Sequence, residues 1–119
     1  MKEAVDYVKK YYDHVDNNQF DELFDLFSDD ILYMRCDCKI KGKDNFIKFY
    51  SQERGIKGKH TLDDIFSDGD KVAVRGVFNG VDKHNKKIVL KFADVFYLDD
   101  FNKIKERYTY LATDYSSTK

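Results

Sequence analysis

The spacing of apolar residues changes once along this chain, near His60, and this change limits the folds available to it. Before that point apolar side chains recur every three or four residues, as on one face of an α-helix. After it, apolar and polar residues alternate with a period of two, as in β-strands. Helices followed by neighbouring strands indicate an α+β domain. We predict a single domain over residues 1–115 and a polar tail at 116–119.

Three helices are predicted in the first half of the chain. The first has an apolar face formed by Ala4, Val5, Val8, Tyr11, Tyr12 and Val15. The second covers residues 20–27, and we expect Asn18 to cap it. A short strand is predicted at 31–38, and a third helix between Gly42 and Gly55, followed by a loop at 55–58.

Four strands are predicted after this loop, separated by turns at 67–70, 82–87 and 99–102. Such short connections pair neighbouring strands antiparallel. Alternation places two sets of side chains on the inner face, namely Val72, Val74, Gly76 and Phe78, and Leu90, Phe92, Asp94, Phe96 and Leu98. Tyr97, Tyr108 and Tyr110 make the other face apolar as well, so we expect a second copy to cover it in a homodimer.

The charge pattern argues against two kinds of partner. The 22 acidic and 21 basic residues are interleaved, so no basic patch is predicted to bind nucleic acid. Apolar stretches are too short to span a membrane, and the chain opens directly into an amphipathic pattern without a signal peptide. We therefore expect a cytoplasmic protein.

Cys36 and Cys38 are two residues apart and are expected on one side of a strand, where a disulfide is geometrically awkward. Reduced thiols fit a cytoplasmic protein. The alternative, a metal site, needs further ligands, and the three histidines show no clustered spacing. We predict neither a metal nor a cofactor.

Several segments, taken in order, resemble a known family. They are YDHVDNN at 12–18, FDEL at 20–23, GKD at 42–44, SDGDKVAVRG at 67–76 and ADVFYLDDFNKI at 93–104. This order is similar to the SnoaL-like branch of the nuclear transport factor 2-like superfamily, which includes ketosteroid isomerases and polyketide cyclases. The resemblance implies a cone-shaped, cystatin-like roll. Three N-terminal helices would pack on a curved, mainly antiparallel sheet around a central pocket, and the convex face would form the dimer.

The resemblance also marks two candidate catalytic residues, Asp94 and Tyr11. In ketosteroid isomerases an Asp at this position stays neutral and donates a hydrogen bond to an enolate oxygen, assisted by a Tyr on the first helix. The alternative is that Asp94 is a structural carboxylate anchored to an arginine and Tyr11 is a core residue. The residues alone leave both interpretations open.

Two arginines stand where relatives carry their bases. Arg35 occupies the position of the isomerase base, and Arg107 and Thr109 occupy positions where many SnoaL-like proteins have His and Asp. A guanidinium cannot act as a general base. We expect both arginines to point inward and an ionised Asp94 to pair with one of them. His60 is a candidate proton shuttle, or alternatively a capping residue at a strand end.

The remaining candidates would line the pocket around a small, partly apolar ligand, with the arginines meeting its anionic or carbonyl end. They are Tyr33, Val15, Phe46, Val74, Gly76, Phe78, Phe92 and Phe96. Gly76 is expected to leave a gap on the inner face. The function predicted is binding of this ligand in the pocket; if the protein is an enzyme, we expect a cofactor-free isomerase, cyclase or hydratase using general acid–base chemistry. The alternative is a non-catalytic ligand-binding or dimerisation module.

Overall fold

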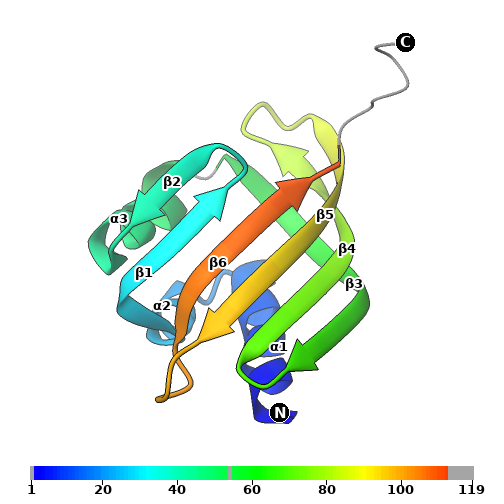
Figure 1. Ribbon diagram of the computed structural model, residues 1–119. Helices are drawn as coiled ribbons and strands as arrows, with labels where there is room; N and C mark the ends of the chain where they lie inside the picture. The colour runs from blue at the N-terminus through cyan, green and yellow to red at the C-terminus, as the bar shows by residue number, and fades with distance from the viewer. Residues whose placement is uncertain (1, 54, 113–119) are drawn as a thin grey trace.

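Helices pack on one face of a six-stranded sheet in the computed structural model, which describes residues 2–53 and 55–112 (Figure 1). The helices are α1 (Lys2–Asp16), α2 (Phe20–Asp25) and α3 (Lys43–Lys48), and a π-helical turn η1 (Phe49–Glu53) continues α3. The strands are β1 (Phe27–Arg35), β2 (Cys38–Lys41), β3 (Ile56–Asp68), β4 (Lys71–Asp82), β5 (Lys87–Leu98) and β6 (Ile104–Leu111). The end of the predicted domain and the polar tail lie outside the described residues.

The strand order is β2-β1-β6-β5-β4-β3, which joins the N-terminal hairpin to the C-terminal meander. β1 pairs parallel with β6, and the other neighbours pair antiparallel. This confirms the predicted α+β class with a mainly antiparallel sheet. The central position of β6 brings residues from both ends of the chain together.

The second helix is shorter than the sequence suggested. It ends at Asp25, and Phe27 begins β1 because it pairs with Ile104 of β6 and is buried there. Asn18 does not cap this helix, since its φ of 58° places it in a turn and Gln19 holds the N-cap position. The helical spacing of apolar residues includes Phe27, but the pairing of this residue with β6 places it in β1 instead.

Two strand boundaries also differ from the prediction. β1 ends at Arg35, and a tight turn at Cys36 (φ 55°) starts β2 at Cys38, so the two cysteines do not share a strand. Both thiols are free and exposed. β3 begins at Ile56 rather than after the predicted loop, where Gly58 faces Gly80 across the ladder. A Cβ on Gly58 would lie 2.2 Å from the Asn79 carbonyl oxygen, so the two backbones approach too closely for a side chain.

The inner face of the sheet is the one that alternation predicted. Val72, Val74, Gly76 and Phe78 of β4 are buried, as are Phe92, Asp94, Phe96 and Leu98 of β5, whereas Leu90 and the neighbours of the buried residues are partly or fully exposed. Val8, Phe46, Phe96 and Ile104 are completely buried, which places the core between the helices and β1, β4, β5 and β6.

The outer face of the sheet carries the aromatic residues expected to form a dimer. Tyr97 and Tyr108 pack edge to face with centroids 5.9 Å apart, and Tyr110 is 57% exposed. The helices lie on the opposite face (Figure 1), so none of them covers these side chains.

We expect a second copy of the chain to cover this face, burying about 1,600 Å² in total, as is usual for a stable interface. Light scattering at micromolar concentration should give twice the 14.1 kDa chain mass. Val95→Lys should halve that mass because it places a charge between Tyr97 and Ala93 on this face, whereas Lys86→Ala in the exposed β4–β5 turn should leave it unchanged. A monomeric wild-type protein would contradict the assignment.

Candidate functional site

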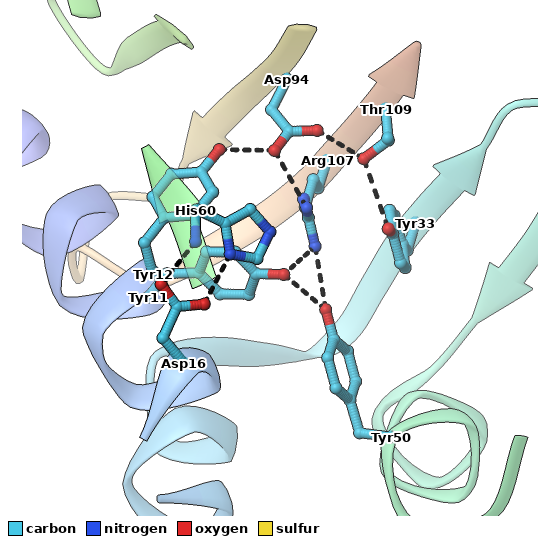
Figure 2. Close-up of polar contacts among 9 residues, drawn as sticks. All are labelled: Tyr11, Tyr12, Asp16, Tyr33, Tyr50, His60, Asp94, Arg107 and Thr109. Atoms are coloured by element: carbon cyan, nitrogen blue, oxygen red, sulfur yellow. Dashed lines mark hydrogen bonds and ion pairs between the residues drawn. The ribbon is translucent and has the colours of Figure 1, made fainter. Parts of the chain in front are cut away.

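The Asp94 carboxylate is the centre of a buried polar network (Figure 2). Its side chain is 1% exposed and accepts three hydrogen bonds. Arg107 Nη2 donates to Oδ2 at 3.0 Å, Thr109 Oγ1 donates to Oδ1 at 2.5 Å, and the Tyr12 hydroxyl donates to Oδ2. The register explains two of these contacts, because Thr109 is directly opposite Asp94 in the β5–β6 ladder and Arg107 is diagonal to it. Both carboxylate oxygens therefore act as acceptors from protein donors.

The Arg107 guanidinium is held on several sides. Its Nη1 donates to the hydroxyls of Tyr11 and Tyr50, the latter at 2.9 Å, and these two hydroxyl oxygens are 2.5 Å apart. The guanidinium carbon lies 4.3 Å from the ring centroid of Tyr11 and 4.6 Å from that of Tyr33. The predicted ion pair between Asp94 and an inward arginine is therefore confirmed, and its partner is Arg107.

Burial and charge act in opposite directions on Arg107. Burial alone would lower the pKa of the guanidinium, but Asp94 and the surrounding tyrosines hold that pKa well above its ordinary value. Burial, reinforced by the Asp94 charge, raises the pKa of Tyr12 well above its usual range. Burial also raises the pKa of Tyr33 to about 12. Since Thr109 has one hydroxyl hydrogen and gives it to Asp94, it accepts from the Tyr33 hydroxyl at 3.3 Å.

One nitrogen of this network lacks a partner. Arg107 Nε is buried, and no described residue offers it an acceptor. A buried N–H without an acceptor is costly, and a molecule entering the adjacent space could satisfy it. Nε is therefore a donor of Arg107 that stays unused while the other two nitrogens bind Asp94, Tyr11 and Tyr50.

A second polar pair joins α1 to β3. Asp16, the last residue of α1, accepts from His60 Nδ1 at 2.6 Å and from the His60 backbone N–H at 2.8 Å. Because a carboxylate only accepts, Nδ1 carries the hydrogen, and in the neutral imidazole Nε2 is an acceptor. The imidazole is 8% exposed and packs against Tyr12, Phe78 and Phe92 at centroid distances of 5.0, 4.9 and 5.4 Å.

A pocket opens between these two polar groups. It is lined by Tyr11, Tyr33, Arg35, Tyr50, Ile56, His60, Phe78, Leu90, Phe92, Asp94, Arg107, Thr109 and Leu111. The cavity has a volume of about 410 Å³ with its open mouth included. A volume of this order suits a small molecule. The described residues contain no group of three or more His, Cys, Asp or Glu arranged to hold a metal ion.

Nine of the residues proposed from the sequence line this pocket: Asp94, Tyr11, His60, Arg35, Arg107, Thr109, Tyr33, Phe78 and Phe92. The other five, Val15, Phe46, Val74, Gly76 and Phe96, are buried elsewhere in the core. Gly76 does not open the expected gap. A Cβ there would lie 2.3 Å from the Thr61 carbonyl oxygen and 3.0 Å from the Phe92 ring, which fills the space.

Sequence reasoning missed three residues and misassigned one contact. Tyr12 rather than Tyr11 donates to Asp94, while Tyr11 and Tyr50 contact Arg107. Tyr12 was available as a candidate because it lies on the same predicted apolar face as Tyr11. Asp16 also gave a signal, since a carboxylate in the last turn of a helix opposes the helix dipole and needs a partner. The sequence pattern indicated only that Tyr50 is a core residue and gave no sign of its contact with Arg107.

The layers and pocket define an α+β domain of the nuclear transport factor 2-like class. An LEH-like epoxide hydrolase from M. tuberculosis superposes with a TM-score of 0.83 at 18% identity, covering 93% of this chain and 84% of that one. An NTF2-like protein of unknown function from Burkholderia pseudomallei gives 0.85 at 15% identity, covering 94% and 92%. A protein with a ketosteroid isomerase-like fold from Catenulispora acidiphila, in complex with trimethylamine, gives 0.76 at 16% identity, covering 87% and 83%. At these identities the similarity shows the fold alone.

The sequence pattern of the SnoaL-like domain matches residues 8–107. The chain therefore belongs to the SnoaL-like domain family, as the order of its motifs predicted. No curated protein sequence matches it significantly. No helix among the described residues is long and apolar enough to cross a membrane.

Replacing Asp94 by Asn should destabilise the fold strongly. The substitution leaves the Arg107 cation buried without a counter-ion, which typically costs about 3–5 kcal/mol. Asp64→Asn is the matched control, because it removes the carboxylate of the exposed pair with Arg75 and should change the unfolding free energy little. Chemical denaturation measures both; equal, small effects would show that the Asp94–Arg107 pair is not buried as described.

The buried Tyr33 hydroxyl should titrate late. Its folded pKa of about 12 lies above the unfolded value of about 10, so its contribution to stability is complete below pH ~10 and is lost as the pH rises towards ~12. In an alkaline titration followed by phenolate absorbance, Tyr33→Phe should remove signal only from the late phase, above pH ~11. Signal lost near pH ~10 instead would place the hydroxyl in water.

Proposed function

We propose that the pocket binds a small, partly apolar carbonyl compound and moves a proton at the carbon next to the carbonyl group, as a cofactor-free isomerase does. One observation carries this proposal. Two polar atoms lack a partner among the described residues, Nε2 of a neutral His60 and Nε of Arg107, and both belong to residues that line one partly apolar pocket. Enolisation needs this pair, a base for the proton and a donor for the oxygen.

The proposed step balances within the pocket. His60 Nε2 takes the proton from the α-carbon, the C–H electrons form the double bond of an enolate, and the carbonyl oxygen gains the negative charge. Arg107 stabilises that oxygen through a hydrogen bond, and its raised pKa ensures that it does not lose its own proton. Asp16 holds the Nδ1 tautomer and stabilises the imidazolium that forms. The imidazolium then returns the proton to the same or a conjugated carbon.

The family and its neighbours support chemistry on small molecules in this fold. The superposed structures include an epoxide hydrolase and a protein with a ketosteroid isomerase-like fold, although fold alone does not assign a reaction. In this proposal Asp94 does not act as the enolate donor. It accepts bonds from Arg107, Thr109 and Tyr12 and so fixes the donor that does.

A second candidate function is ligand binding without chemistry. The observation in its favour is that Asp94, the carboxylate nearest the polar end of the pocket, is fully engaged by protein donors. The two candidates differ in their dependence on His60. A carrier needs only the shape of the pocket, whereas proton transfer also needs the base.

Exchange of α-hydrogens for deuterium tests the proposal without knowledge of the natural substrate. In heavy water, the protein should accelerate exchange in small ketones, from acetone to cyclohexanone, as followed by NMR. His60→Gln should lower that rate by about a hundredfold or more, the usual contribution of a general base. Asp16→Asn should lower it less, because it misorients the imidazole without removing it.

His84→Gln is the matched control, since His84 is exposed in the β4–β5 turn far along β4 from the network. The His84→Gln protein should accelerate deuterium exchange in the ketones at the wild-type rate. Saturation-transfer NMR on the same ketones reports binding separately. Ketones that bind to wild-type and His60→Gln protein without any accelerated exchange would reject the isomerase and favour the carrier.

A further inference from the structure

The two arginines of the pocket differ in how their charges are balanced. Arg107 is 3% exposed and forms an ion pair with Asp94, so together they contribute no net charge. Arg35 is half-buried and lines the same pocket. No described carboxylate forms an ion pair with it, and Asp94 is the only carboxylate among the described residues that line the pocket. Within the part of the chain that the structure describes, Arg35 is therefore the positive charge of this site that no carboxylate balances.

The guanidinium of Arg35 is also positioned for a planar anion. It stacks on the Phe49 ring with its carbon 5.5 Å from the centroid, and Phe49 is itself buried at the start of η1. Stacking covers a face of the guanidinium and restricts its rotation. The N–H groups at its edge are suited to a two-point contact with a carboxylate, which a lysine could not make.

The sheet register sets the distance between the two arginines. In the β1–β6 pair Tyr33 is opposite Arg107, and Arg35 is opposite Thr109. Arg35 is thus one strand across and two residues further along than Arg107. With about 3.3 Å per residue and about 4.8 Å between strands, their backbones are roughly 8 Å apart. A ligand that reaches both arginines has its two polar ends separated by a short chain.

We propose that Arg35 selects substrates that carry a carboxylate, so that the site takes short oxo acids. The carboxylate binds Arg35 on the Phe49 side of the pocket, and the keto oxygen binds Arg107 Nε. This inference rests on the proposed function for the keto group, but the charge selection stands on Arg35 alone. Arg107 binds the neutral keto oxygen rather than the carboxylate, because Asp94 already balances the charge of Arg107.

Binding of levulinate and its homologues with one or two further methylenes tests the inference, each compared with its neutral amide. Dissociation constants come from NMR titration. Wild-type protein should bind the best acid about fivefold or more tightly than its amide, and salt should reduce that ratio. Arg35→Gln should bring the ratio to about one, and Arg35→Lys should restore it only partly.

Lys39→Gln is the matched control, because it removes one positive charge from β2 opposite Met34, on the other face of the sheet from Arg35. It should keep the wild-type ratio. If Lys39→Gln and Arg35→Gln lowered the preference for the acid over the amide equally, the net charge of the protein rather than the pocket would attract the acid. That result would overturn the inference. So would a wild-type ratio near one.

Deuterium exchange in the same compounds separates this inference from the proposed function. Exchange that depends on His60 but is equal for acid and amide would retain the isomerase and reject the role of Arg35. A preference for the acid that depends on Arg35, without any exchange, would retain the selection and reject the isomerase.

Discussion

The ion pair between Asp94 and Arg107 is the constraint on which the rest of this site depends. Two opposite charges, both almost fully buried, are tolerated only if each is hydrogen-bonded as well as paired. The groups that hydrogen-bond to them come from helices and sheet alike: Tyr11 and Tyr12 from α1, Tyr50 from η1 and Thr109 from β6. The hydrogen bonds to the pair therefore form only when helices and sheet are in their native positions. The geometry of the site consequently depends on the whole fold.

This requirement also determines which residues are left for chemistry. A carboxylate that holds three donors is a poor proton carrier, and a guanidinium whose pKa is raised further keeps its proton. In the proposed reaction the network positions a donor, Arg107 Nε. In the proposed reaction the base therefore comes from outside this network: it is His60, which lines the same pocket and is held by Asp16.

The sequence predicted most of the fold because periodicity reports which face of an element is buried. It placed Phe92, Asp94 and Phe96 on one inner face, and it placed an arginine beside Asp94 because a buried charge needs a partner. It could not tell Tyr11 from Tyr12, since adjacent residues on a broad apolar helix face differ only by helix rotation. It also missed the tight turn at Cys36, where a residue other than glycine adopts positive φ. Asp16 and His60 are far apart in sequence, so only tertiary structure shows their contact.

Tyr12 connects the two halves of the site and fixes their relative position. Its hydroxyl donates to Asp94, and its ring packs on the His60 imidazole at 5.0 Å. Asp16, which orients that imidazole, lies one helical turn further along α1. A single rigid helix therefore positions both the carboxylate that anchors Arg107 and the base on the opposite side. Any shift of α1 along its axis would change the contact of Asp16 with His60 and the contact of Tyr12 with Asp94 together. In the proposed reaction these contacts position the base and the donor, so one helix controls both.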